Sequence, residues 1–249
     1  MRPDLMRRAL RIGLPTLLLG GGLALGGLAL NPVPGQADEA PHLVPAPALD
    51  LPPAHGLRTL VVSGGCFWGV QGVFQHVRGV RDAVSGYAGG ARDTAQYETV
   101  STGTTGHAES VRITYDPAVV SYGTLLRIFF SVALDPTQRG GQGPDEGSQY
   151  RSEIWTTTPA EARVARAYIA QLDASHAFEA AIATRVDSLP AFYPAESYHQ
   201  NYLTLNPNQP YIAINDIPKV EALQRIFPQD WQAKPVLVPE TAQQNTPPA

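Results

Sequence analysis

The sequence contains only one cysteine, Cys66, among its 249 residues. One thiol excludes a disulfide within the chain and a Cys-x-x-Cys dithiol motif. The six histidines show no paired spacing of the kind that zinc sites use. We therefore expect no bound cofactor or metal. The unpaired thiol is the first place to look for chemistry.

Positive charge is also scarce. The formal net charge is −4, and no basic stripe is present that could neutralise the phosphates of a nucleic acid. The glycine-rich stretches at 103–109 and 139–147 lack the strand, Gly-Lys-Ser/Thr and helix arrangement of a phosphate-binding loop. These absences argue against nucleic-acid and nucleotide binding. With 43% hydrophobic residues, the chain can bury the core of one sizeable domain.

The first 30 residues differ in composition from the rest of the chain. Four arginines, the last of them Arg11, precede an uncharged run at 12–30 that is rich in leucine and glycine. We interpret residues 1–37 as an export signal or, because the run is long enough to span a bilayer, as an uncleaved membrane anchor. Either interpretation predicts an exported protein, periplasmic or membrane-anchored and facing outside the cytoplasm.

Two stretches of extended composition border the predicted domain. Seven prolines lie between Asn31 and Pro53, which predicts an extended linker at 38–56. Residues 232–249 are similar and are interpreted as a disordered tail. We expect neither stretch to carry packed structure. Residues 57–231 remain as the folded domain that carries the chemistry.

The residues around Cys66 predict a strand-to-helix turn. An apolar, β-branched run at 57–62 is typical of a buried strand, and 70–77 shows helical spacing. Gly64 and Gly65 permit a tight turn between them. At such a turn the amides and dipole of the helix N-terminus would stabilise a thiolate and lower its pKa. The alternative is a buried cysteine that acts only as a small hydrophobic side chain.

The expected elements follow the order β-α-β-β-α-β. Further strands are predicted at 80–88, 108–115 and 148–155, and Ser121 is the expected cap of the second helix. This order predicts an α+β fold, a two-layer ferredoxin-like sandwich with helices on one face of a mostly antiparallel sheet. A helix at 159–173 and a strand near 178–186 would extend it as C-terminal additions.

Glu109 is the main candidate for an acid group. Strand alternation places it on the same face as Val111 and Ile113, which are typical core residues. A carboxyl group there would have a raised pKa and could donate a proton. A salt-bridged or edge-exposed glutamate is the alternative. A Cys66 hydrolase with His107 or His199 as its base is a further possibility.

Six short motifs resemble those of one known family, the A-type peptide methionine sulfoxide reductases. They occur in order between about residues 58 and 205. The motifs are Gly64-Gly65-Cys66-Phe67-Trp68-Gly69, Gly86-Tyr87-Ala88-Gly89-Gly90, Thr105-Gly106-His107-Ala108-Glu109, Tyr115-Asp116-Pro117, Gln149-Tyr150-Arg151-Ser152 and Tyr198-His199-Gln200.

The resemblance implies reduction of the S epimer of methionine sulfoxide, free or in proteins, to methionine. It implies that Cys66 attacks the sulfoxide sulfur and becomes a sulfenic acid, and that Glu109 protonates the sulfoxide oxygen. It assigns Tyr97 and Tyr150 to holding that oxygen and gives Asp145 a supporting polar role. Phe67 and Trp68 would form the apolar pocket for the substrate methyl group. His199 is expected to be a structural hydrogen-bonding group.

The sequence departs from the family pattern in three places. Gln71 stands where glutamate is frequent, and Pro144 stands where asparagine is frequent. Many relatives also carry later cysteines that resolve the sulfenic acid, and none follows Cys66 here. Regeneration must then use an external thiol, either thioredoxin, glutaredoxin or a small thiol. We expect a monomer that contacts a membrane only through an uncleaved N-terminal segment. A methionine-sulfoxide-binding module without turnover is the non-enzymatic alternative.

Overall fold

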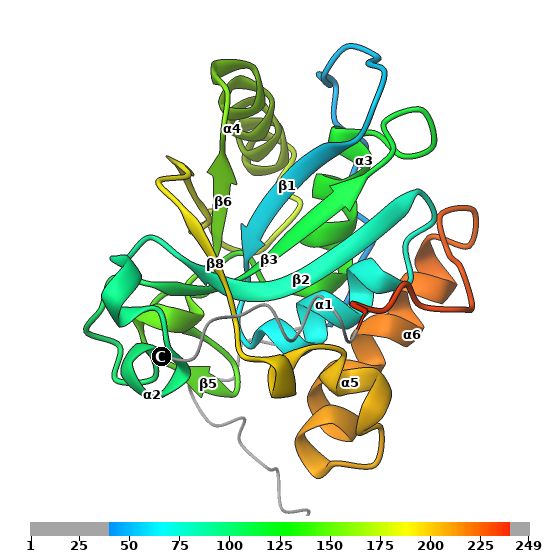
Figure 1. Ribbon diagram of the computed structural model, residues 1–249. Coiled ribbons are helices and arrows are strands. Elements are labelled where there is room, and N and C mark those ends of the chain that lie inside the picture. The colour runs from blue at the N-terminus through cyan, green and yellow to red at the C-terminus, as the bar shows by residue number, and fades with distance from the viewer. Residues whose placement is uncertain (1–39, 240–249) are drawn as a thin grey trace, which may run out of the picture. The chain divides into compact units, whose positions relative to one another are not determined.

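The computed structural model of the protein describes residues 40–239 (Figure 1). The predicted signal or anchor at 1–37 lies outside the described residues. Across 40–239, no helix is both long enough and apolar enough to cross a membrane.

A mixed sheet of six strands forms the centre of the fold (Figure 1). Its order is β7-β6-β1-β3-β2-β8, and all neighbours are antiparallel except β6 and β7, which are parallel. The bounds are β1 (Arg58–Ser63), β2 (Val80–Ala88), β3 (Ala108–Tyr115), β6 (Glu153–Thr156), β7 (Arg185–Ser188) and β8 (Phe192–Pro194). The α+β class is confirmed. The sheet gains β7 and β8 beyond the four-strand core.

Six α-helices are interspersed with the strands along the described chain. Their bounds are α1 (Phe67–Gln75), α2 (Tyr97–Val100), α3 (Tyr122–Ile128), α4 (Pro159–Ala174), α5 (Tyr202–Leu205) and α6 (Ile217–Ile226). Two π-helical turns, η2 (Phe129–Ala133) and η5 (Ile212–Asp216), adjoin α3 and α6. The 3₁₀ turns are η1 (Arg92–Thr94), η3 (Ser148–Tyr150) and η4 (Ser197–His199), and β4 (Gly141–Gln142) pairs with β5 (Asp145–Glu146).

Local sequence signals explain where two of the helices begin. Ser121 accepts a hydrogen bond from the Thr124 amide at 3.0 Å, as expected of the cap of α3. Thr158 and Glu161 form a reciprocal capping box around Pro159 at the start of α4. The expected strand at 148–155 instead begins with η3, and β6 starts at Glu153. The expected strand near 178–186 is also wrong in extent, because β7 begins only at Arg185.

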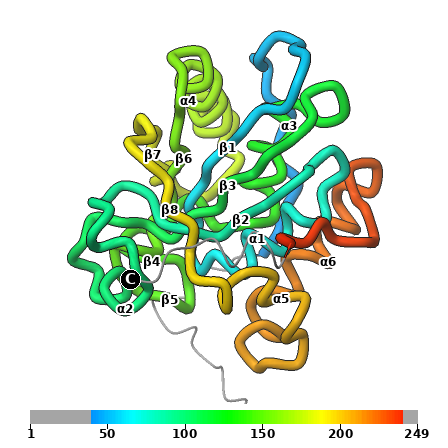
Figure 2. Tube along the Cα trace, viewed as in Figure 1, coloured from blue at the N-terminus to red at the C-terminus, as the bar shows by residue number. Residues whose placement is uncertain are grey.

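One core holds the two layers together. Side chains of α1, α3, α4 and α6 belong to the same hydrophobic cluster as Leu60 and Val62 of β1, so these helices cover one face of the sheet. Val61, with the opposite alternation, joins a small cluster with Ala88, Ala108 and Trp155 on the other face. Figure 2 shows α5 and α6 beside α1, which they contact.

The expectation that the proline-rich stretch carries no packed structure is wrong for residues 40–51, which we call the N-terminal strap. Val44 is fully buried, and its carbonyl accepts a hydrogen bond from Arg127 Nε. The Tyr168 hydroxyl donates to the Pro45 carbonyl at 2.6 Å. Proline fixes an extended backbone, and its carbonyl remains free to accept from neighbouring helices, so composition alone does not distinguish a docked strap from a solvated linker.

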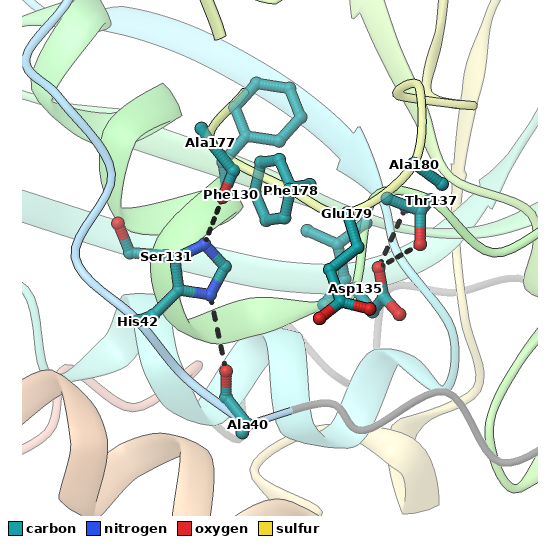
Figure 3. A pocket seen from close by; sticks show the side chains of 11 residues that line it. Ala40, His42, Phe130, Ser131, Asp135, Thr137, Ala177, Phe178, Glu179 and Ala180 are labelled. Carbon is teal, nitrogen blue, oxygen red and sulfur yellow. Dashed lines mark hydrogen bonds between the residues drawn. The ribbon is translucent and has the colours of Figure 1, made fainter. Parts of the chain in front are cut away.

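Figure 3 shows where the N-terminal strap borders a cavity of about 520 Å³. His42 Nε2 lies 3.0 Å from the Ala177 carbonyl oxygen, and the His42 ring meets Phe178 edge to face at 4.7 Å. None of the predicted site residues lines this cavity. The strap thus contacts η2 and the segment after α4, and the cavity that it borders is separate from the predicted site residues.

The predicted disorder of the tail is also wrong for residues 232–239, the C-terminal strap. The amides of Gln232 and Val236 donate to the carbonyls of His76 and Gln75 at the end of α1. Asn201 binds both the amide and the carbonyl of Val238. The last carbonyls of a helix have no partner within the helix, and the strap supplies two of the missing donors.

Candidate active site

The predicted turn around Cys66 is confirmed. Cys66 lies between β1 and α1 at the N-cap position of the helix. Gly65 before it has φ +86°, and a Cβ atom there would lie 2.8 Å from Gln142 Cβ. Both the backbone conformation and the close approach therefore require glycine. The turn presents the thiol to the end of the sheet where Glu109 lies.

Glu109 is an acid group bound directly to the start of α1. Pairing of β1 with β3 brings it beside the turn, where its Oε2 accepts a hydrogen bond from the Phe67 amide at 3.0 Å. The side chain is 4% exposed. Burial, with smaller effects from the charges of Asp145 and Asp216, raises the pKa of Glu109 to about 8. The expected rise in pKa is confirmed, and the carboxyl group is mostly protonated at neutral pH.

The expected lowering of the thiol pKa is wrong for this site. Burial raises the pKa of the Cys66 thiol well above its ordinary value, and the negative charges of Glu109 and Asp216 raise it further. The Trp68 amide hydrogen bond acts in the opposite direction but does not outweigh them. The dipole of a short helix is a weaker influence than desolvation next to carboxylates. The resting site therefore holds a neutral thiol.

The two predicted tyrosines share the electrostatic environment of Cys66. Burial raises the pKa of Tyr150, and the charges of Glu109, Asp145 and Cys66 add to the shift. Burial also raises the pKa of Tyr97, with smaller contributions from Glu109 and Cys66. Both phenols stay protonated and remain hydrogen-bond donors. The predicted groups at 97, 109, 145 and 150 thus all lie within electrostatic reach of Cys66.

Asp145 is held by a residue that the sequence did not single out. The Tyr211 hydroxyl donates a hydrogen bond to Asp145 Oδ2. Burial raises the pKa of Asp145, and the bond from Tyr211 partly offsets this rise. Asp145 thus lies at the edge of the site, fixed by the segment that precedes α6.

The aromatic residues after Cys66 occupy different surroundings. Phe67 is fully buried, and its ring lies 5.1 Å from the His199 ring. Trp68 is half-buried and stacks on Tyr202, with ring centroids 3.9 Å apart and planes at 13°. Tyr211 meets the Trp68 ring edge to face at 6.1 Å. These rings form an aromatic wall at the start of α1.

The histidines do not form a base for a thiol hydrolase. His199 Nδ1 accepts a hydrogen bond from Trp68 Nε1 at 3.2 Å, and burial lowers the pKa of His199 to about 4. His107 Nδ1 accepts from the Gly90 amide, and its Nε2 lies 2.9 Å from the Ala91 carbonyl oxygen. Both rings are engaged in structural bonds. The expected structural role of His199 is confirmed.

The sequence profile of the family described as "Peptide methionine sulfoxide reductase" matches residues 58–231. The chain belongs to this family. The reductase is 57% identical to peptide methionine sulfoxide reductase MsrA 2 of Mesorhizobium japonicum over 190 residues, which cover 76% of this chain and 97% of the relative. It is 46% identical to MsrA 2 of Synechocystis sp. over 220 residues, covering 87% of this chain and all of that relative.

Solved structures agree with this assignment. The reduced form of Mxr1 from Saccharomyces cerevisiae is 30% identical with a TM-score of 0.56, covering 61% of this chain and 87% of that one. Methionine sulfoxide reductase A of Corynebacterium diphtheriae is 32% identical with a TM-score of 0.53, covering 69% and 90%. The resemblance drawn from the sequence motifs is confirmed. The family match also extends past residue 205 to include α6.

Several residues at the reductase site were missed from the sequence. Glu196 accepts hydrogen bonds from the Tyr87 hydroxyl at 2.8 Å and the Tyr97 amide at 2.9 Å. Asp216 is fully buried, lies 3.8 Å from Lys219 Nζ and packs so close to Gly69 that a Cβ there would be 2.2 Å from its Oδ1. The sequence does carry one indication of a buried acid here, because Asp216 stands among the isoleucines of η5 and α6.

A network of side-chain amides joins α1 to the segment around Gln200. Gln71 Nε2 donates to the Ala83 carbonyl at 2.9 Å and to Gln200 Oε1 at 2.8 Å, and Gln71 Oε1 accepts from the Asn201 amide. Gln200 in turn bonds the amide and the carbonyl of Ser85 in β2. Glutamine at position 71, where the family frequently has glutamate, thus supplies both a hydrogen-bond donor and an acceptor to this buried network, which we call the amide joint.

The described part of the chain contains no geometric cluster of metal ligands, around the site or elsewhere. Among residues 40–239, no group of three His, Cys, Asp or Glu side chains is arranged to hold a metal ion. What the described residues do bring together is a buried thiol, a carboxyl group that is largely protonated at neutral pH and two phenols.

Proposed function

We propose that this reductase converts the S epimer of methionine sulfoxide, free or in proteins, to methionine. One observation carries the proposal. The buried Cys66 thiol and the largely protonated Glu109 carboxyl group meet at the start of α1, where the Phe67 amide binds Glu109. A sulfoxide oxygen is a poor leaving group until it is protonated, and this pairing supplies both the nucleophile and the acid.

The reaction transfers one oxygen atom and two electrons. Cys66 Sγ attacks the sulfoxide sulfur while Glu109 gives its proton to the sulfoxide oxygen. The protonated oxygen then moves from the substrate sulfur to Cys66 Sγ: an Sγ–O bond forms while the substrate S–O bond and the new Sγ–S bond break. Methionine leaves, and Cys66 is left as a sulfenic acid. The substrate sulfur is reduced by two electrons, and the Cys66 sulfur is oxidised by two.

The high pKa of the thiol fits this sequence of steps. Cys66 begins as a neutral thiol in a buried site beside acidic groups. When its sulfur attacks, its proton can pass to Glu109 as Glu109 protonates the oxygen. The net transfer from sulfur to oxygen creates no new charge in the low-dielectric site, which lowers its cost.

The phenols and the aromatic wall complete the division of roles. Tyr97 and Tyr150, whose pKa values are raised, donate hydrogen bonds to the polarised oxygen. Asp145 supports the site through its bond with Tyr211. Phe67 and Trp68 give the substrate methyl group an apolar contact. A methyl group offers nothing else to recognise, so this contact selects the orientation of the S epimer.

Regeneration of Cys66 requires an external thiol. No second cysteine is present in the chain to form an internal disulfide. One thiol condenses with the sulfenic acid, releasing water and forming a mixed disulfide, and a second thiol exchange frees Cys66. Thioredoxin, glutaredoxin or a small thiol would each satisfy this chemistry.

The proposed site of action is outside the cytoplasm. The arginines before an uncharged run at 12–30 support export, followed by cleavage near Ala37 or retention as an anchor. We also infer a ferredoxin-like core within the sheet. The antiparallel order β6-β1-β3-β2, with α1 and α3 as the crossing helices, supports it.

Single-turnover reduction of the two separated methionine sulfoxide epimers tests the proposal. The prereduced full-length protein is expected to give about one methionine per Cys66 from the S epimer and none from the R epimer, because one thiol supplies one electron pair. Cys66→Ser is expected to give none. Methionine from Cys66→Ser, or binding of sulfoxide with no methionine from the native protein, would refute the proposal.

A further inference from the structure

Arg151 is not one of the proposed reacting groups, yet its side chain donates four hydrogen bonds to residues near the site. Its Nε donates to Glu153 Oε2 at 2.6 Å. Nη1 donates to the carbonyl oxygens of His107 at 3.1 Å and Ser148 at 2.9 Å, and Nη2 donates to that of Gly106 at 3.1 Å. The Arg151 side chain is 16% exposed, and Glu153 is fully buried.

Each partner of Arg151 belongs to a backbone segment that carries a site residue. His107 comes two residues before Glu109, and Ser148 comes two before Tyr150. Glu153 pairs with Ser63 at the end of β1, three residues before Cys66. One guanidinium group therefore connects the segments that carry the acid, a phenol donor and the nucleophile.

The Arg151 guanidinium is closely packed on the side that faces Gly89 and Trp155. A Cβ atom on Gly89 would lie 3.0 Å from Arg151 Nη2 and 2.8 Å from the Trp155 ring. The guanidinium carbon lies 5.6 Å from the Trp155 ring centroid. An ammonium group has no planar set of donors, so lysine cannot reach the same carbonyls together.

We propose that Arg151 is a positioning residue for the reaction, which holds Glu109 and Tyr150 at the sulfoxide oxygen while Cys66 attacks. The inference rests on the proposed function. Arg151 touches no reacting atom, and the methyl pocket at Phe67 and Trp68 does not depend on its bonds. Loss of Arg151 should therefore slow the chemical step more than it weakens substrate binding.

Single-turnover kinetics of the full-length protein test this role. Arg151→Ala is expected to lower the rate constant for sulfoxide reduction by about 100-fold, the cost of a small misplacement of reacting groups, with little change in the half-saturating sulfoxide concentration. Arg151→Lys is expected to keep a thermal midpoint near that of the native protein and still lose most of the rate.

Arg185→Ala is the matched control. Arg151 and Arg185 both line a cavity of about 570 Å³. Arg185 Nη2 lies 3.8 Å from Glu153 Oε1, but it donates its hydrogen bond to Asp187 in β7. We expect the native rate for this variant. The cavity also gives access for chemical rescue. Guanidinium chloride, compared with sodium chloride at equal ionic strength, is expected to restore activity to Arg151→Ala and to leave the native rate of Arg185→Ala unchanged.

The outcomes separate the inference from the proposed function. An inactive native protein would refute the function itself. An active native protein with a native rate in Arg151→Lys would overturn the inference. A loss in Arg151→Lys that appears only as weaker substrate binding would also overturn it. If Arg151→Ala does not fold, Arg151→Lys carries the test alone.

Discussion

Glu109 is an acid that the fold keeps uncharged near neutral pH. Its pKa is raised from an ordinary 4.5 to about 8, chiefly because the carboxyl group is buried. Carboxylate desolvation usually destabilises a protein, and here the folded state binds the proton more tightly than the unfolded chain does. The stabilising effect of that proton is complete below about pH 4.5 and is lost as the pH rises through about 8.

The pH dependence of the chemical step follows from this proton. If Glu109 is the donor, the single-turnover rate on a substrate without ionisable groups should fall as the pH rises through about 8. Glu109→Gln should lose at least about 100-fold in rate and show no such fall, since the amide does not titrate.

The same pH profile could also contradict the assignment of Glu109 as the proton donor. Ionisation of Cys66 would raise the rate with increasing pH, the opposite direction. A native rate that climbs through pH 8, or a Glu109→Gln variant that keeps the fall, would show that Glu109 is not the proton donor. Glu98→Gln, at an exposed position on α2, is the matched control and should keep the native profile.

At this scale the sequence predicted the acid and misjudged the thiol. Strand alternation placed Glu109 among Val111 and Ile113, and that burial is what raises its pKa. The helix start at Cys66 suggested a stabilised thiolate. The thiol pKa is instead raised, in part by the charge of Asp216. Asp216 lies 150 residues away in the chain and packs against α1 only in the folded protein.

Among the elements, the N-terminal strap has the clearest structural role. Asp50 Oδ1 accepts a hydrogen bond from the Gly123 amide at 2.8 Å, in the first turn of α3. A carboxylate there satisfies a helix donor and interacts well with the positive end of the helix. The strap is thereby part of the domain core, and a truncation at the predicted boundary of 57 would remove it.

Denaturant unfolding measures this contribution. Asp50→Ala is expected to lower the free energy of unfolding by about 1 kcal/mol, as loss of a helix cap does. Asp93→Ala, on the exposed turn η1, is the control and should change it by less than about 0.5 kcal/mol. Equal stability of Asp50→Ala and the native protein would mean that the strap does not support α3.

Element prediction succeeded where periodicity was strong and failed where contacts decide. The ranges of β2 and β3 follow from alternation, and Ser121 marks the start of α3. The straps have no periodicity, and their hydrogen bonds go to residues such as Tyr168 and Gln75, far along the chain. The short helices α2 and α5 have only four residues each, too few to leave a pattern.

For the whole molecule, the single cysteine sets the chemistry of the oxidised state. After one turnover without a reductant, intact mass spectrometry should show one added oxygen atom, and none in Cys66→Ser. Addition of a monothiol should convert this species to a mixed disulfide at Cys66. No loss of two hydrogens, the mark of an internal disulfide, is expected at any stage. Such a loss would contradict the proposed dependence on an external thiol.

The amide joint around Gln71 affects how the enzyme responds to its surroundings. Gln71, Gln75, Gln200 and Asn201 link α1 to the C-terminal part of the domain, and none of them titrates. Outside the cytoplasm, where we propose that the protein acts, acidity follows the environment. Acid stress would change the protonation of carboxyl groups elsewhere but would leave this connection intact. The placement of α1, the helix that begins after Cys66, would then not depend on the pH around the protein.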